Sequence, residues 1–500
     1  MSTTQTLIRN SIFRNVQFFI MVIVTFLMTP FIVQSLGDRY YGFWTLVGTF
    51  MGYYGLLDLG LSSAVARYVS QALGKDDFKS MSAIASTSFG LFTAISALAL
   101  LVTLIVVSAC PLFIKNPEEV ALFRKVFLLM GMTVAIGFPF RVFGGILTSF
   151  LRHDLIALIS ITRTISANVA IYYFLSQGHG ILSLVIINCL ASMFEYFSTY
   201  LLCRAKFPLV EAGLKHFDRS RIRELFTYSG KTLVIQIADL LRFRVDALVI
   251  AIFLNVSLVT YYSIGSKLID YFGWFMVSTI GFVGPLFSQY EGRGDFETLR
   301  KRFLDITKIS TVLSVFIGMS IIFYGKPFIA RWMGPGFESS YLVAVILCIP
   351  AMIALTQTAG LQMLYGLSKH HYYAISNVCE GLLNLLLSIV LVKHYGMYGV
   401  ALGTAAEMVL FKIFIQPVFI CRAIGLPVTD YVIKTILLTA VKSLLPLLIY
   451  FYLITGYMKA DYLHLFAFAS VQSLLFIPVF YFFILNKEMK QLIRGAIGFT

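Results

Sequence analysis

Ionisable side chains interrupt several long apolar stretches of this sequence of 500 residues, and they are the groups best placed to do chemistry. The richest stretch, residues 225–254, holds Asp239, Arg242, Arg244 and Asp246. At about 100° per helical residue, Asp239, Arg242 and Asp246 share one helix face, whereas Arg244 points away. A guanidinium on such a face can bind phosphate through its fork of N–H groups, and a carboxylate can bind a cation.

Other stretches carry charges at comparable positions. Those in 11–36, 41–70 and 257–290 are Arg14, Asp58, Arg67, Lys267 and Asp270. A charge in the middle of a bilayer costs about 2.5–3.5 kcal/mol on insertion scales, so such groups usually face a bundle interior or water. The four stretches therefore look like the walls of one polar cavity. Intrahelical ion pairs such as Arg242 with Asp246 are an alternative for single pairs, but they do not explain the concentration of charge.

The sign of the ligand is not decided by counting these charges. An anionic ligand would use the arginine forks on its phosphates, whereas a cationic drug would use the acids. Aromatic rings in the middle of the same stretches, Tyr53, Tyr54 and Tyr271, can stack on sugar rings. Tyrosines near segment ends are more often interfacial anchors, and that alternative stays open.

The composition places these charges in a membrane. The chain is 59% hydrophobic and 13% charged, with a mean hydropathy of +0.85, whereas roughly a quarter of the residues of a soluble protein are charged. Backbone groups in lipid must be satisfied within their own segment, so apolar stretches of about 20 residues are predicted to be helices. We therefore expect an all-α integral membrane protein with about fourteen transmembrane helices. The predicted helices cover residues 11–36, 41–70, 81–110, 124–150, 153–176, 180–204, 225–254, 257–290, 302–325, 341–366, 370–394, 397–422, 433–456 and 463–486.

The net charge of +15 reflects topology and does not indicate nucleic-acid binding. When the N-terminus is placed in the cytoplasm, the inward ends and loops carry about three times as many Lys and Arg residues as the outward ones. This bias predicts that both termini are cytoplasmic.

Enzyme and metal motifs are absent from the sequence. The six cysteines have no CxxC or metal-ligand spacing, so they are predicted to be free thiols among apolar side chains. No P-loop, HExxH, GxSxG or glycosyltransferase DxD motif occurs. The sequence therefore predicts no catalytic residue and no metal site.

The chain repeats itself at a spacing of 218 residues. Residues 70–78, SQALGKDDF, reappear at 288–296 as SQYEGRGDF with five identities, and the CRA of 203–205 reappears at 421–423. Many transporters are duplicated membrane bundles with the substrate path between the copies. Six helices per copy is an even number, so the repeat is predicted to be parallel. The predicted parts are an N-terminal lobe at 1–205, a cytoplasmic linker at 206–224, a C-terminal lobe at 225–423 and two additional helices at 424–500.

Several stretches resemble a known family. LGDRYYGFW at residues 36–44 and LLDLGL at residues 56–61 resemble the second-helix signature of polysaccharide exporters of the O-antigen flippase (Wzx-like) type. These exporters belong to the multidrug/oligosaccharidyl-lipid/polysaccharide flippase superfamily. Residues 228–246, 261–263 and 396–401 are similar to the same family, so the likeness spans the chain.

This resemblance implies two lobes around a central cavity that opens alternately to each side of a bacterial inner membrane. It implies a transporter, not an enzyme, that moves a polyprenyl-diphosphate-linked oligosaccharide from the cytoplasmic to the periplasmic leaflet. Such a substrate is the repeat unit of O-antigen or of another surface polysaccharide. Partners would be the membrane, the lipid-linked oligosaccharide and other polysaccharide assembly proteins.

The resemblance also implies roles for the cavity charges. The expected phosphate-binding bases are Arg242, Lys267, Arg14 and Arg67. The acids expected to orient these bases or to carry a coupling cation, Na⁺ or H⁺, are Asp58, Asp239, Asp246 and Asp270.

Two other functions fit part of the sequence. A cation-coupled multidrug antiporter of the same superfamily would use the acids as its binding site. A membrane-embedded polysaccharide polymerase or acyltransferase would need a large outward loop or a clustered His/Asp/Arg site, and the sequence has neither. Transport of a lipid-linked oligosaccharide is therefore the leading hypothesis.

The charge bias generates a test of topology. Single cysteines introduced at Gly37, Gly178 and Lys326 should react with a membrane-impermeant thiol reagent applied from outside. Cysteines at Gly74 and Gly292 should be protected until the membrane is permeabilised. External labelling at Gly292 would contradict both the topology and the parallel repeat.

Overall fold

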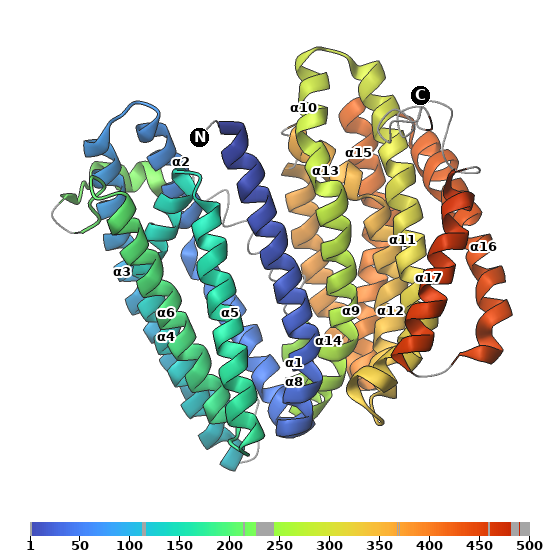
Figure 1. Cartoon of the computed structure of the whole chain (residues 1–500), viewed down its shortest axis with the longest axis horizontal. Coiled ribbons are helices and arrows are strands. Elements are labelled where there is room, and N and C mark those ends of the chain that lie inside the picture. Colours follow the sequence, from blue (N-terminus) through green and yellow to red (C-terminus); the bar gives the residue numbers. More distant parts are fainter. Residues whose placement is uncertain are drawn as a thin grey trace. The chain divides into compact units, whose positions relative to one another are not determined.

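The computed structural model describes residues 3–112, 117–213, 216–226, 245–367, 369, 371–458, 461–481 and 490, and these residues form helices and no β-strand (Figure 1). The all-α fold predicted from the apolar stretches is thereby confirmed. The chain divides into two compact units. Unit 1 comprises Met1–Leu240 and Leu254–Thr260, and unit 2 comprises Leu241–Phe253 and Tyr261–Thr500.

Long helices make up the described part of unit 1, and α4 packs on α2, α3 and α6, while α5 packs on α1 and α6. The elements are α1 (Thr3–Tyr53), η1 (Tyr54–Asp58), α2 (Leu61–Leu73), α3 (Phe78–Ala109), η2 (Cys110–Leu112), α4 (Pro117–Ser149), α5 (His153–Ser176) and α6 (Ile181–Lys206).

Unit 2 is built in the same way, with α12 packed between α11 and α14, and α8 packed on α14. Its elements begin with α8 (Val245–Phe253), α9 (Val256–Ile280), η4 (Gly281–Val283), α10 (Gly284–Gly292), α11 (Phe296–Met333), α12 (Glu338–Thr356), α13 (Thr358–Gly366) and α14 (His371–Leu410). They continue with η5 (Phe411–Ile415), α15 (Gln416–Ile424), η6 (Asp430–Leu437), α16 (Leu438–Ile454), η7 (Thr455–Tyr457) and α17 (Tyr462–Val479).

Nine helical stretches of the described residues are long and apolar enough to cross a membrane, and Tyr462–Pro478 is a shorter apolar helix. Much of the predicted helix at 225–254 lies outside the described residues. The number fourteen therefore stays a prediction.

The second predicted helix, residues 41–70, is broken, so the prediction of one continuous helix is wrong there. The chain leaves α1 at Tyr53, forms the 3₁₀ turn η1, and passes through left-handed backbone at Leu59 (φ 52°) and Gly60 (φ 78°) before α2 begins. A break inside a membrane is tolerated where the protein supplies partners for the freed polar groups. The turn η1 ends at Asp58, one of the predicted cavity acids, so this acid lies within the break.

The repeated loop folds in the same way in both units. Asp77 caps α3 and Asp295 caps α11, each by accepting a hydrogen bond from the N–H three residues ahead, at 2.9 and 3.0 Å. Each cap N–H also donates to the carbonyl five residues back, at 3.0 Å in both units. The residue before each cap is left-handed, with φ 52° at Asp76 and φ 68° at Gly294. The repeat in sequence is therefore a repeat in local structure.

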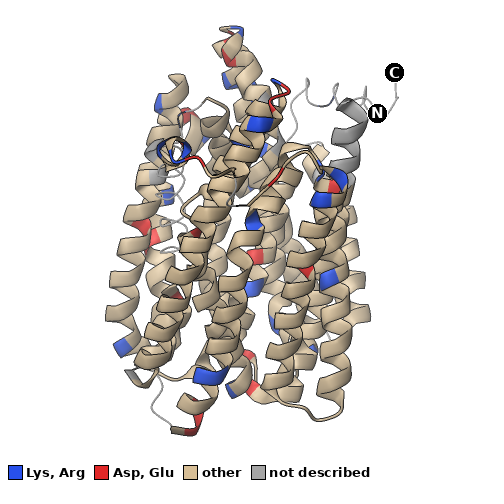
Figure 2. Ribbon diagram, turned by 90° about the vertical axis from the view of Figure 1, so that its left-hand side faces the viewer, with Lys and Arg blue, Asp and Glu red and all other residues tan. Residues whose placement is uncertain are grey.

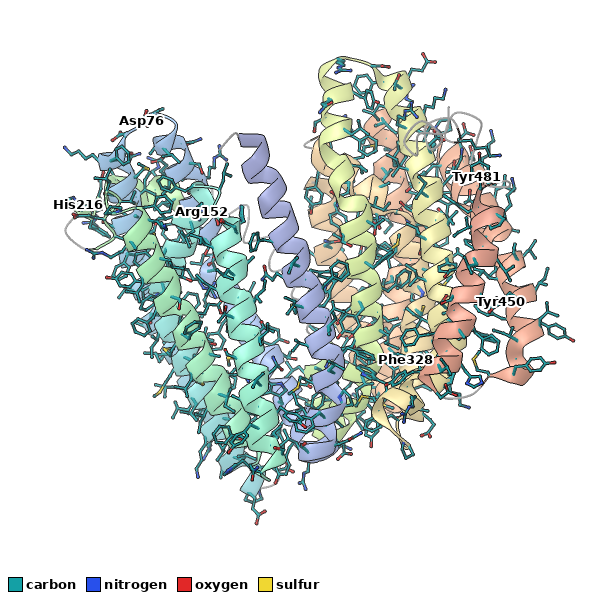
Figure 3. All side chains as sticks on the ribbon, in the orientation of Figure 1. Asp76, Arg152, His216, Phe328, Tyr450 and Tyr481 are labelled. Carbon is teal, nitrogen blue, oxygen red and sulfur yellow. The ribbon has the colours of Figure 1, made fainter. Side chains whose placement is uncertain are left out.

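Part of the predicted linker lies along α3. Three hydroxyl oxygens of α3 accept backbone N–H groups of residues 211–218 at 3.0 to 3.2 Å, and they belong to Ser82, Ser86 and Thr87. Figure 3 shows His216 of this segment at the same end of unit 1 as Asp76 and Arg152. Because these hydroxyls satisfy backbone N–H groups, the described residues of this segment are tied to unit 1 by hydrogen bonds to side chains of α3.

Glycines allow close packing of the helices. A Cβ at Gly265 of α9 would lie 2.5 Å from the backbone oxygen of Ser340 on α12, and one at Gly145 of α4 would lie 2.7 Å from Val65 on α2. Lipid gives apolar helices no hydrophobic reason to associate, so close van der Waals contact between small residues must supply much of the attraction.

This packing predicts opposite effects of the same substitution at two positions of α9. Gly265→Ala should lower the Tm of the detergent-purified protein, because a backbone oxygen cannot move aside as a flexible side chain can. Gly273→Ala should keep or raise the Tm, because a Cβ there meets no atom within 4 Å and alanine favours a helix by roughly 0.5–1 kcal/mol. Equal Tm changes in the two variants would contradict the close contact.

Candidate functional site

Charged residues are sparse along the middle of the helices and frequent at their ends (Figure 2). In unit 1, Asp58 is a buried exception, with 5% of its surface exposed. Its Oδ1 accepts a hydrogen bond from Ser62 N at 3.2 Å, and its Oδ2 accepts one from Ser62 Oγ at 2.5 Å. Arg141 of α4 donates from Nη1 to Oδ2 at 2.9 Å. The break after η1 thus places a carboxylate where α2 and α4 can both reach it.

Sequence reasoning missed Arg141. Its guanidinium carbon lies 4.4 Å from the centroid of the Phe138 ring, in a cation–π contact, and its side chain is 35% exposed. The sequence did contain an indication of this residue. An acid within an apolar stretch, such as Asp58, usually pairs with a base, and Arg141 lies within the apolar stretch 124–150.

A second ion pair of unit 1 joins α5 to α6. Arg163 Nε lies 3.2 Å from Glu195 Oε2, and Arg163 Nη2 lies 3.5 Å from Ser192 Oγ. The two charged side chains are similarly exposed, at 33% and 34%. This pair therefore differs from Asp58 and Arg141, of which the acid is buried and the base is partly exposed.

In unit 2, Asp246 lies at the start of α8 among neutral polar groups. Tyr262 OH donates to Asp246 Oδ2 at 2.5 Å, and Asn384 Nδ2 donates to Oδ1 at 3.3 Å. The Thr404 hydroxyl lies 3.1 Å from both Asp246 Oδ2 and Asn384 Oδ1. Ser388 Oγ donates to Asn384 Oδ1 at 3.0 Å. Two hydroxyls and one amide N–H thus contact the Asp246 carboxylate, and the Asn384 oxygen and the Ser388 hydroxyl lie one hydrogen bond further away.

A fully buried ion pair lies nearby in sequence. Lys412 Nζ donates to Glu380 Oε1 at 2.6 Å and to Gln416 Oε1 at 2.8 Å, and the two charged side chains are 2% and 0% exposed. Lys412 belongs to η5, a π-helical turn whose carbonyl at Lys412 accepts from Gln357 Nε2 at 2.6 Å. Such turns are rare inside α-helices and often mark functional positions.

The structure places the remaining predicted residues as follows. Arg242 and Asp239 lie outside the described residues, and so does the side chain of Arg14. Arg67 is exposed on α2, with its guanidinium carbon 5.9 Å from the Tyr68 ring centroid. Lys267 is partly buried and Asp270 is exposed, both on α9.

The three candidate tyrosines differ in exposure. Tyr54 is 2% exposed, its hydroxyl is hydrogen-bonded to Thr103 Oγ1, and its ring centroid lies 6.3 Å from that of Phe127, so it occupies a core position. Tyr53 and Tyr271 are partly exposed. Of the three candidates, Tyr53 and Tyr271 are therefore the ones that keep some exposed surface.

Residues 36–342, more than half of the chain, match the family described as "Polysaccharide biosynthesis protein". The "Uncharacterized membrane protein EpsK" of Bacillus subtilis (strain 168) is 24% identical over 433 residues, covering 82% of each chain. The "Putative O-antigen transporter" of Shigella flexneri is 19% identical over 420 residues, covering 82% of this chain and 97% of the relative.

Solved structures share the fold. The lipid II flippase MurJ in an inward closed conformation superposes with a TM-score of 0.71 at 16% identity, covering 94% of this chain and 98% of MurJ. An inward-facing multidrug resistance MATE transporter superposes with a TM-score of 0.65 at 14% identity, covering 80% of this chain and 95% of that protein. On the strength of the family match over residues 36–342, the chain belongs to the polysaccharide biosynthesis protein family.

Proposed function

We propose that this protein is a flippase that moves a polyprenyl-diphosphate-linked oligosaccharide, the repeat unit of a surface polysaccharide. Transport runs from the cytoplasmic to the periplasmic leaflet of a bacterial inner membrane by alternating access, and both termini are cytoplasmic. The family match over residues 36–342 carries this proposal. A relative named for O-antigen transport and the fold shared with the lipid II flippase support it.

The physical requirement of such transport agrees with the buried polar groups. A diphosphate carries negative charge that hydrocarbon does not solvate, so its path needs fixed cations and hydrogen-bond donors. Arg141 and Lys412 are described bases that lie within apolar helical stretches. The bases predicted to meet the phosphates, Arg242, Lys267, Arg14 and Arg67, remain part of this proposal.

The experiment that tests this function is complementation of a deletion strain. The deletion should abolish the surface polysaccharide and leave its lipid-linked repeat unit in the cytoplasmic leaflet, and the wild-type gene should restore export. Arg242→Gln should fail to restore it, and Arg242→Lys should restore only part, because an ammonium cannot reproduce the guanidinium fork.

Protein level in the membrane fraction is the control for each variant. Normal polysaccharide in the deletion strain would contradict the proposed function. Increased drug sensitivity with unchanged polysaccharide would instead favour a multidrug antiporter.

We further propose that Asp246 binds the coupling cation. Hard cations prefer oxygen ligands, and Asp246 lies beside several. It accepts hydrogen bonds from Asn384 Nδ2 and from the Thr404 hydroxyl, and that hydroxyl also lies 3.1 Å from Asn384 Oδ1. The carbonyl of Val400 lies 3.3 Å from Thr404 Oγ1 and 3.5 Å from Ser388 Oγ. Asp246 adds one negative charge to these neutral oxygens, which suits a monovalent cation such as Na⁺.

A pair of substitutions at Thr404 tests this cation site. Thr404→Val removes the hydroxyl while keeping the shape, and it should abolish any rise in Tm when NaCl replaces KCl at equal ionic strength. Thr404→Ser keeps the hydroxyl and should keep the effect of Na⁺. Binding at 100 times Kd would stabilise the folded protein by about 2.7 kcal/mol.

Two results would count against the Na⁺ site. An unchanged effect of Na⁺ in Thr404→Val would remove this hydroxyl from it. Export that responds to pH and not to Na⁺ would assign the coupling to H⁺.

A further inference from the structure

Arg141 lies on a face of α4 that differs from its apolar exposed face. Leu129, Met132 and Ile136 are exposed at 39%, 44% and 49%. Arg141 follows Ile136 by five residues, which is about 140° around the helix. A lipid-facing surface is apolar, so the exposed part of Arg141 belongs to a second, chemically distinct face of this helix.

Two glycines near the ion pair have no neighbouring atoms where a side chain would lie. A Cβ at Gly144, three residues after Arg141, would meet no atom within 4 Å. The same is true at Gly55, three residues before Asp58. The two halves of the ion pair thus each lie one turn from unfilled space in unit 1. Arg141 is eight residues from the end of α4, or about 12 Å of helix rise, which is deep within an apolar helix.

Asp58 and Arg141 differ in how many of their hydrogen-bonding groups have a partner. Asp58 is buried and already accepts two hydrogen bonds from Ser62, one on each carboxylate oxygen. Arg141 donates to protein through Nη1 alone among the described residues, although a guanidinium has five N–H donors. The Phe138 ring fixes one side of the guanidinium. An oriented base with unused donors therefore lies one helical turn from the open space at Gly144.

We propose that Arg141 is an anion-binding residue that receives a phosphate of the transported lipid diphosphate, and that Asp58 is the positioning residue that holds it between transport cycles. This inference rests on the proposed function for the identity of the anion. The unused N–H groups of Arg141 match the fork geometry that phosphate oxygens accept. Asp58 neutralises the guanidinium when no anion is bound, which lowers the cost of a charge at this depth.

The chain contains a matched control in Arg163 and Glu195. This ion pair also joins two helices of unit 1, and both of its side chains are about one-third exposed. Glu195, unlike Asp58, has no hydrogen-bond donor of the kind that Ser62 provides, within the described residues. Arg163 is therefore paired with an acid that has no other donor in the described part of the chain, and replacing it should weaken anion binding much less than replacing Arg141 does.

Binding of farnesyl diphosphate to the purified full-length protein tests the assignment. Arg141→Gln should weaken binding by about tenfold or more, as expected for the loss of a charge-assisted hydrogen bond. Arg141→Lys should lie between Arg141→Gln and the wild type. Asp58→Asn should bind at least as tightly as the wild type, because it removes the carboxylate that competes with the phosphate.

Opposite effects from the two halves of one ion pair are the signature of a binding role. If Asp58→Asn weakened binding as much as Arg141→Gln, the pair would be structural and the proposal would be overturned. Unchanged binding in Arg141→Gln, or equal loss in Arg163→Gln, would overturn it too. If Arg141→Gln does not fold, the comparison of Arg141→Lys with Asp58→Asn decides, because one alters the donor fork and the other its competitor.

Complementation separates this inference from the proposed function. If the wild type restores polysaccharide export while Arg141→Gln binds farnesyl diphosphate normally, the flippase function stands and the role of Arg141 falls. If the deletion leaves polysaccharide unchanged, the flippase function falls. Arg141-dependent binding of the diphosphate in that case would still assign the anion site.

Discussion

The absence of water from the hydrocarbon core is the constraint on which the rest of this structure depends. Every backbone and side-chain polar group at that depth must find a partner in the protein, which is why the described chain is helical. The same constraint explains why hydroxyls such as Thr133 and Thr311 return a hydrogen bond to the carbonyl four residues earlier, at 2.8 Å in each case. Helices then associate through close contact at small residues.

The two units satisfy this constraint for their buried charges in different ways. Unit 1 places the acid Asp58 against a base and a serine. Unit 2 surrounds the acid Asp246 with neutral donors and separately buries the Lys412–Glu380 pair. Removing one partner of a buried ion pair leaves an uncompensated charge, so these groups are retained together or lost together. A guanidinium whose own N–H donors are partly unused, as in Arg141, suits an anion. A carboxylate beside neutral hydroxyl and amide groups, as in Asp246, suits a small cation.

The 218-residue repeat preserves the loop at Asp77 and Asp295 and does not preserve the charges of the Asp58–Arg141 pair. The capping aspartates Asp77 and Asp295 occupy equivalent positions and make equivalent hydrogen bonds. The equivalents of Asp58 and Arg141 in the second copy are instead Met276 and Ala359. Loop geometry is tied to how helices connect, which both copies need. A charged side chain in the membrane costs free energy, so it is retained only where it has a function. Each copy therefore carries charged residues at different positions.

The sequence by itself determined the helical class and the repeat, and it included Asp58 and Asp246 among its candidate acids, because hydropathy, spacing and charge are local properties of the chain. Only the tertiary structure decided their partners. Arg141 reaches Asp58 across 83 residues, and Thr404 reaches Asp246 across 158. Helical periodicity tells which face a residue occupies, but not which helix lies against that face. Neutral partners such as Thr404 carry no signal in sequence, since a membrane helix contains many hydroxyls that bond only to their own backbone.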